Sequence, residues 1–144
     1  MGAGGDRLAH WEGLADHGWS AISVIHPAAQ VSPSARVGAG CVVGPGAVIG
    51  AASELGEHVL LGRGALLGHH AVLEAGATLN PGANVAGHVR VWRGVTVGMG
   101  AIVADHLEVG AGAMIAAGAA VVRDVAAGVR VQGVPARPYE GGDG

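Results

Sequence analysis

Large aliphatic residues recur along this chain with a period of six. From Val31 to Val121 every sixth position is Val, Ile or Leu, sixteen times in succession without an exception. A second register, four positions after each aliphatic, holds mostly small residues such as Cys41, Ala47 and Ser53. A period of six matches neither the 3.6-residue repeat of an amphipathic helix nor the two-residue alternation of a half-buried strand. We therefore interpret each hexad as a short flat strand followed by a corner.

Three such hexads close one triangular coil, with the aliphatic residue inside and the small residue in the corner. Successive coils then stack about 4.8 Å apart through backbone ladders. The pattern resembles the hexapeptide-repeat family, which implies an all-β fold, a left-handed parallel β-helix of about five coils. A right-handed β-helix or another solenoid is the competing interpretation, but those repeats are longer or less strict. Glycine often follows the aliphatic, as at Gly38 and Gly68, and we expect these glycines to make the sharp turns.

The pattern changes on both sides of the repeat. Leu8, Trp11 and Leu14 have near-helical spacing, which predicts a short amphipathic helix from Asp6, a possible N-cap, to His17. The expected organisation is a helix with a lead-in strand at 1–25, the coil at 26–125, and an exit segment at 126–144 whose tail after Tyr139 is mobile.

Composition and charge narrow the classes of partner. The net charge is −3 and the arginines are scattered, so we expect neither nucleic acid nor an anionic membrane as a partner. Cys41 is the single cysteine and excludes an intrachain disulfide. No apolar run approaches the roughly 20 residues that span a bilayer. The first residues lack the basic and apolar regions of a signal peptide, so a soluble, cytoplasmic protein is expected.

Two further segments indicate which of the hexapeptide-repeat proteins the chain resembles. Residues 24–35, Val-Ile-His-Pro-Ala-Ala-Gln-Val-Ser-Pro-Ser-Ala, and residues 133–138, Gly-Val-Pro-Ala-Arg-Pro, look like the entry and exit of the coil in the sialic-acid O-acetyltransferase and nucleotide-sugar N-acetyltransferase family. The resemblance implies acetyl transfer from acetyl-CoA to an amino or hydroxyl group of a small, sugar-like acceptor, such as an amino sugar or a nucleotide sugar. Of the family's N-terminal sugar-binding domain, only the last element has a possible counterpart, at residues 6–25.

The family's catalytic motif has a partial match in the middle of the coil. Leu67-Gly68-His69-His70 resembles Val-Gly-His-Asp/Glu, which implies that His69 is the general base. Gly87 matches the position whose N–H resembles an oxyanion donor, and it lies 18 residues after His69, hence one coil above it. An imidazole, whose unperturbed pKa is about 6.5, can take the proton of an attacking amine or hydroxyl.

The resemblance also implies where acetyl-CoA binds: in a groove between the subunits of a homotrimer. The implied cofactor-binding residues are Thr78, Met99, Ala117, Arg123 and Arg137. Two positions depart from the family pattern, because His70 replaces an acidic residue and Thr78 replaces a histidine. These departures favour the alternative, a non-catalytic trimeric scaffold or partner subunit with a degenerate site.

Histidines also recur with the period of one coil. His70, His88 and His106 are each 18 residues apart, and Asp124 follows in the same register, so the three imidazoles should form one column. Such a column suits a metal site, a cleft lining or an exposed ladder of weakly interacting rings; we favour the ladder and expect no metal. The γ-type carbonic anhydrases share the coil, but their His-x-x-x-x-His pair and Arg-Gly-Asp run do not occur here.

Overall fold

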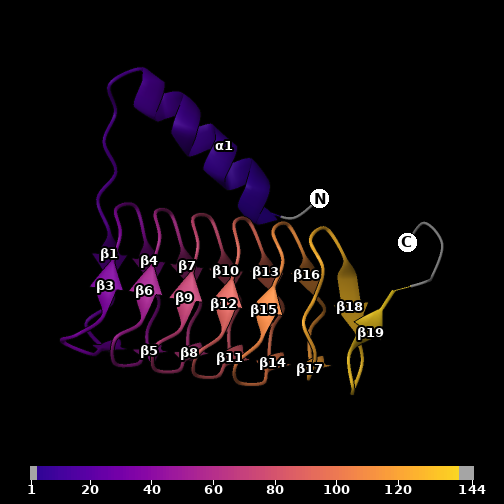
Figure 1. The fold of residues 1–144 in the computed structure, drawn as a ribbon. Helices are drawn as coiled ribbons and strands as arrows, with labels where there is room; N and C mark the ends of the chain where they lie inside the picture. The colour runs from indigo at the N-terminus through magenta and orange to yellow at the C-terminus, as the bar shows by residue number, and fades with distance from the viewer. Residues whose placement is uncertain (1–2, 140–144) are drawn as a thin grey trace.

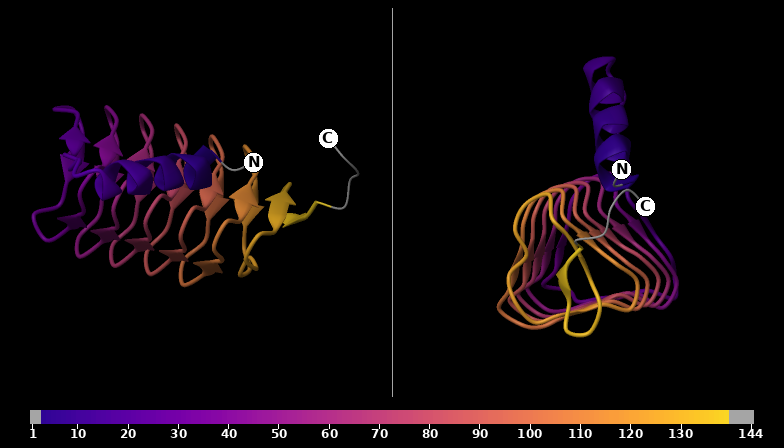
Figure 2. Two further views of the ribbon diagram at one scale, coloured as in Figure 1. Left: turned by 90° about the horizontal axis from the view of Figure 1, so that it is seen from above. Right: turned by 90° about the vertical axis from the view of Figure 1, so that its right-hand side faces the viewer.

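The computed structural model describes residues 3–139, which form a three-sided parallel β-coil with one helix lying over it (Figure 1). Seen along its axis, the coil is triangular (Figure 2). Helix α1 spans Ala3–Asp16, so it begins three residues before the expected start at Asp6. The predicted mobility after Tyr139 concerns residues outside the described part of the chain.

Each side of the triangle is one sheet of very short strands. Sheet A contains β1 (Val24–Ile25), β4 (Val42–Val43), β7 (Leu60–Leu61), β10 (Thr78–Leu79), β13 (Thr96–Val97), β16 (Met114–Ile115), β18 (Arg130–Gln132) and β19 (Arg137–Pro138). Sheet B contains β2 (Gln30–Val31), β5 (Val48–Ile49), β8 (Leu66–Leu67), β11 (Asn84–Val85), β14 (Ile102–Val103) and β17 (Ala120–Val121). Sheet C contains β3 (Arg36–Val37), β6 (Glu54–Leu55), β9 (Val72–Leu73), β12 (Arg90–Val91) and β15 (Glu108–Val109).

Strands pair in parallel with the strand one coil later, and through β17 the paired residues are 18 apart, as Thr78 and Thr96 are. This register is what three hexads per coil predict. The coil has about six turns, one more than expected, because β1 pairs with β4 and β18 pairs with β16 beyond the ends of the aliphatic repeat. Only β18 and β19 pair antiparallel.

From β4 to β18, the second residue of each short strand is buried and contributes to the hydrophobic core. Leu73, Leu79 and Val85 are fully buried, and so are the small corner residues Ala71 and Ala77. A core of aliphatic residues and alanine explains how the chain packs with almost no aromatic side chains, because the narrow triangular interior has no room for them. The expected positions of the large and small residues are confirmed.

The expectation for the glycines that follow the aliphatics was wrong. Gly68 does not adopt a left-handed conformation; instead, a Cβ there would come within 2.4 Å of the Gly87 nitrogen. Close approach of the next coil explains this glycine. The left-handed turn lies two residues later in the hexad, for example at Gly64 (φ 66°) and Gly82 (φ 72°), where a Cβ is unfavourable.

Helix α1 is fixed to the coil by a small set of polar and aromatic contacts. Arg7 donates hydrogen bonds to the Thr78 hydroxyl (3.1 Å) and to the His58 carbonyl (2.8 Å). Trp11 stacks on His58 with ring centroids 5.4 Å apart, and Glu12 pairs with an arginine of the coil, Arg93. No helix in residues 3–139 is long and apolar enough to cross a membrane.

The last coil is shorter than the others by two residues. Val125 bridges to Val109, which is 16 residues earlier, and the Asp124 carboxylate accepts a hydrogen bond from the Glu108 N–H (2.8 Å). Asp124 therefore does not extend the histidine column in register, contrary to expectation. Its carboxylate closes the end of the sheet C ladder.

Candidate active site

Four histidines gather at the corner that joins sheet B to sheet C, and we call them the histidine corner: His69, His70, His88 and His106. His69 and His70 form the turn between β8 and β9, and His88 and His106 occupy the next two turns. Backbone hydrogen bonds from His88 N to His69 O (3.0 Å) and from His106 N to Gly87 O (3.1 Å) stack these turns. All four side chains are exposed, so they can contact a ligand or another subunit.

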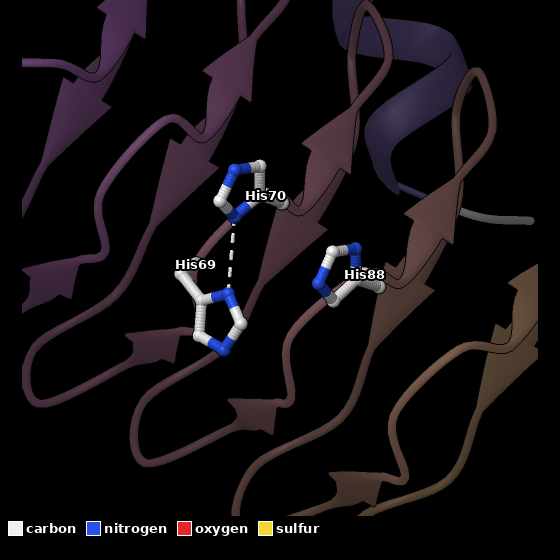
Figure 3. A group of neighbouring side chains, drawn as sticks. All are labelled: His69, His70 and His88. Carbon is white, nitrogen blue, oxygen red and sulfur yellow. Dashed lines mark hydrogen bonds between the residues drawn. The ribbon is translucent and has the colours of Figure 1, made fainter.

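The rings lie against one another (Figure 3). The Nδ1 atoms of His69 and His70 are 3.1 Å apart, so one donates a hydrogen bond and the other accepts it. The His70 and His88 rings are stacked at 5.0 Å and the His88 and His106 rings at 4.6 Å, while His69 meets His88 edge-on at 5.1 Å. The predicted column is present. His69 joins it from the side, which the 18-residue period alone did not indicate.

Gly87 lies directly above His69. A Cβ built on Gly87 would be 3.0 Å from His69 Nε2 and 3.2 Å from its Cε1, so the imidazole lies against the bare Cα. Within residues 3–139, the Gly87 N–H donates to no backbone carbonyl. This amide can therefore donate a hydrogen bond to an acceptor atom of a ligand that reaches it.

Gly87 is also the one glycine in its register. The equivalent position of every other hexad from residue 33 to residue 123 carries a side chain: Pro33, Ala39, Pro45, Ala51, Glu57, Arg63, His69, Ala75, Pro81, Arg93, Met99, Asp105, Ala111, Ala117 and Arg123. Gly87 has no positive φ that would require glycine. The coil thus accepts side chains of any size here, and position 87 alone leaves open the space above His69.

The electrostatics of the corner change along the column. Desolvation, and then the neighbouring imidazoles of His106, His69 and His70, hold the pKa of His88 below its ordinary value. At the far end, His106 Nδ1 lies 2.7 Å from the Asp105 carboxylate, and this hydrogen bond lowers the pKa of Asp105. Asp105 thus remains an anion beside His106. His69 has no such acidic neighbour in the chain, because the residue that follows it is His70.

Thr78 lies away from the histidine corner within one chain. It is on sheet A, the side of the triangle opposite the turn that carries His69. Its side chain is 5% exposed beneath α1, and its hydroxyl accepts a hydrogen bond from Arg7. A contact between this hydroxyl and a cofactor would have to displace Arg7.

The other predicted cofactor-binding residues form two groups. Met99 and Ala117 are exposed and stack at the corner between sheets A and B, joined by a hydrogen bond from Gly118 N to Met99 O (2.8 Å). Arg123 and Arg137 line one cavity of about 300 Å³ at the C-terminal end of the coil. The structure therefore brings the two arginines together but does not bring Met99 or Ala117 to them.

No protein-family model and no curated protein matches the sequence. Solved structures, however, match nearly the whole chain. A single-site variant of perosamine N-acetyltransferase from Caulobacter crescentus, in complex with CoA and GDP-perosamine, is 35% identical, with a TM-score of 0.94 over 98% of this chain and 67% of that one. The chain belongs to the hexapeptide-repeat acetyltransferases. The predicted left-handed parallel β-helix and the enzyme class are confirmed.

Two further members of this acetyltransferase family are equally similar. PerB from Caulobacter crescentus, in complex with CoA and GDP-perosamine, is 37% identical, with a TM-score of 0.93 over 96% of this chain and 67% of that one. The acetyltransferase domain of PglB from Neisseria gonorrhoeae, in complex with acetyl coenzyme A, is 36% identical, with a TM-score of 0.92 over 96% of this chain and 68% of that one.

Two features of the acetyltransferase's site went unrecognised in the sequence. One is the contact of His88 with His69, whose sequence separation of 19 is one coil plus one residue. The other is the uniqueness of Gly87 in its register. Only the second signal was available in the sequence, because aligning the hexads in groups of three displays each corner as a column. The contact of His88 with His69 also depends on side-chain direction.

Proposed function

We propose that this chain is an acetyl-CoA-dependent N- or O-acetyltransferase acting on a small sugar-like acceptor, with His69 as general base. PerB and the PglB domain were solved with CoA or acetyl coenzyme A, and PerB also with the nucleotide amino sugar GDP-perosamine. Within the chain, the observation that carries the proposal is that the exposed imidazole of His69 lies beside Gly87, the one glycine at this position of the hexads from residue 33 to residue 123.

The proposed chemistry needs two proton transfers, both through His69, and one oxyanion site. His69 donates from Nδ1 to His70, which leaves the lone pair of Nε2 available beside Gly87. Nε2 accepts the proton of the acceptor's amine or hydroxyl as its nitrogen or oxygen attacks the thioester carbon. The Gly87 N–H stabilises the oxygen that becomes negative. As the carbonyl re-forms, the C–S bond breaks and the protonated His69 gives its proton to the leaving thiolate, which departs as the thiol of CoA. No covalent acyl-enzyme is required.

His70 replaces the family's acidic residue as the partner of His69 Nδ1. A neutral His70 accepts the hydrogen bond from His69 Nδ1 and so fixes the tautomer of His69. An acidic residue at this position would fix the tautomer in the same way. It adds no negative charge to stabilise the protonated base. The departure from the family pattern is therefore compatible with catalysis, at a lower rate than an acidic neighbour would give.

The cavity at the end of the coil suits the anionic part of the cofactor. Arg123 and Arg137 both line it, and guanidinium groups bind phosphate with paired hydrogen bonds. Val129 and Pro138 supply apolar walls. We propose that these arginines bind the phosphates of acetyl-CoA and that Met99 and Ala117 contact its arm from the neighbouring corner.

The site is completed, in this proposal, by a homotrimer. Sheet B presents an outward row with exposed apolar residues next to the histidine corner: Val48 is 36%, Leu66 40% and Ile102 52% exposed. The outward row of sheet C is mostly charged: Arg36, Glu54, Val72, Arg90 and Glu108. An apolar row of this kind favours association through sheet B. A partner packed there lies beside His69 and can enclose the exposed imidazoles.

The trimer is tested by light scattering after size-exclusion chromatography. Ile102→Glu places a charge in the apolar row and is expected to give monomers. Val72→Glu, which also introduces a carboxylate but in the outward row of sheet C, is the control and should keep the wild-type mass, because that row is already charged, with Glu54 and Arg90 on either side of Val72. A monomeric wild type would refute the trimer.

The reaction is tested by mass spectrometry of products from a panel of free amino sugars and nucleotide-linked amino sugars. We expect an acetylated product from at least one acceptor, and His69→Ala should abolish turnover while leaving acetyl-CoA affinity and the trimer unchanged. Wild-type turnover in His69→Ala would show that His69 is not the base.

A further inference from the structure

We propose that His69, His70 and His88 bind a divalent transition-metal ion of the Zn²⁺ type, and that the bound ion reversibly inhibits acetyl transfer. The binding half of this inference rests on the histidine corner alone. The inhibition half rests on the proposed role of His69 as the base. The two halves are therefore tested by separate measurements.

The distances between the donor atoms suit such an ion. One ring nitrogen from each of His69, His70 and His88 lies within 4.8 Å of the other two, and the His69 and His70 Nδ1 atoms are 3.1 Å apart. Around tetrahedral Zn²⁺, with Zn–N bonds of about 2.05 Å, ligand nitrogens lie about 3.3 Å from one another. Two ligands therefore already have the required spacing. Small rotations of exposed rings can bring in the third.

The backbone gives a second, independent observation. From residue 46 to residue 118, the left-handed position at the corner between sheets A and B is glycine in every coil: Gly46, Gly64, Gly82, Gly100 and Gly118. The histidine corner carries no glycine at this position: Ala52 (φ 56°) comes first, and His70, His88 and His106 follow it with φ of 56°, 57° and 60°. A left-handed conformation costs an L-residue about 1 kcal/mol or more. The corner bears this cost in four successive coils, and in three of them the residue is a histidine, which places the rings of His70, His88 and His106 in one column.

The chemistry of the donors selects the class of ion. Three neutral imidazoles suit Zn²⁺, Ni²⁺ and Cu²⁺, whereas Mg²⁺ and Ca²⁺ prefer carboxylate and carbonyl oxygens. His106 lies outside the ligand set, because the ring nitrogens that come within 4.8 Å of one another are those of His69, His70 and His88. Because the three histidine side chains are exposed to solvent, the fourth coordination position of the ion is left to water or to another ligand.

Metal binding and base catalysis compete for the same electron pair. A neutral imidazole has one nitrogen lone pair, and a metal bound to His69 occupies it. The proton then stays on the other nitrogen, so His69 cannot accept one from the acceptor. A metal at this site therefore inhibits acetyl transfer and does not promote it.

Binding is tested by calorimetric titration of tag-free protein with ZnCl₂, with MgCl₂ as the hard-cation control. We expect saturable binding of about one Zn²⁺ per chain and no heat from Mg²⁺. His70→Gly and His88→Gly should each weaken Zn²⁺ binding by at least about tenfold, since even loss of an outer-shell partner has that effect. His106→Gly is the matched control, with the same substitution in the same column, and should bind within about twofold of wild type.

Glycine is the residue that most other hexads carry at this position, so the three variants should fold, and circular dichroism checks this. Absence of saturable Zn²⁺ binding to the wild type would overturn the site. Equal weakening in His106→Gly and His88→Gly would overturn the ligand set.

Inhibition is tested by following the acetylated product by mass spectrometry, with each variant compared with its own metal-free rate. Zn²⁺ should suppress wild-type and His106→Gly turnover, EDTA should restore both, and His88→Gly should need at least about tenfold more Zn²⁺. Zn²⁺ binding without loss of turnover would overturn the inhibition. A chain that binds Zn²⁺ but transfers no acetyl group would refute the proposed function and leave the metal site standing.

Discussion

Replacing Gly87 with alanine tests most sharply whether the space above His69 serves catalysis. The new Cβ would lie 3.0 Å from Nε2 and 3.2 Å from Cε1 of His69. Carbon contacts are most favourable at about 3.5–4.0 Å, so the imidazole must retreat by about 0.5 Å. A misplacement of about 1 Å can cost about a hundredfold in rate, while the backbone N–H of residue 87 is kept in alanine. We therefore expect kcat to fall by about tenfold to about a hundredfold, or about 1.4–2.7 kcal/mol.

The fold should not suffer, because every other hexad in this register already carries a side chain. Gly→Ala restricts the unfolded chain, so the free energy of unfolding should stay within about 1 kcal/mol of wild type. Ala51→Gly is the matched control: Ala51 lies one coil before His69 in the same column, and its replacement should leave turnover unchanged. The assays are product formation at saturating acetyl-CoA and urea unfolding followed by circular dichroism. Wild-type turnover in a folded Gly87→Ala protein would refute the reasoning.

Three further predictions concern the core, the helix and the cofactor. Leu73→Ala removes a fully buried core side chain and should lower the free energy of unfolding by about 3 kcal/mol, whereas Val72→Ala, the outward neighbour in β9, should cost much less; equal losses in urea unfolding would contradict the inward–outward assignment. Arg7→Met leaves buried polar partners on the coil unpaired, at a cost of about 1–3 kcal/mol, and should expose α1 to limited proteolysis, while unchanged protection would show that Arg7 does not fix the helix. Arg123→Ala should weaken acetyl-CoA binding measured by calorimetry, whereas Arg36→Ala on sheet C should not; identical affinities would remove Arg123 from the cofactor site.

The fold could be predicted from the sequence because one physical requirement repeats in every hexad. Each short strand must bury one large side chain and leave room for a small one at the corner, so Leu73 and Ala71 are recognisable from spacing alone. The conformation of the glycines was not recognisable in this way. Both the close approach at Gly68 and the left-handed turn at Gly64 require glycine, and only the backbone separates the two causes.

The candidate site was predictable only in part. The coil period placed Gly87 above His69 because both lie in one column. The edge-on contact of His69 with His88 depends on side-chain direction, which a one-dimensional period does not contain. The pairing of Arg7 with Thr78 joins residues 71 apart through the docking of α1, and no repeat relates them. The position of each residue in the stack of coils therefore follows from the sequence period. The direction of the side chains and the docking of α1 on the coil do not.

The central claim, that this acetyltransferase uses acetyl-CoA, is tested most directly by titration calorimetry of the purified protein with acetyl-CoA, with free CoA as the comparison. We predict saturable binding of about one molecule per chain, unchanged in His69→Ala. Absence of binding at millimolar acetyl-CoA would contradict the account and favour a non-catalytic trimeric scaffold built on the same coil.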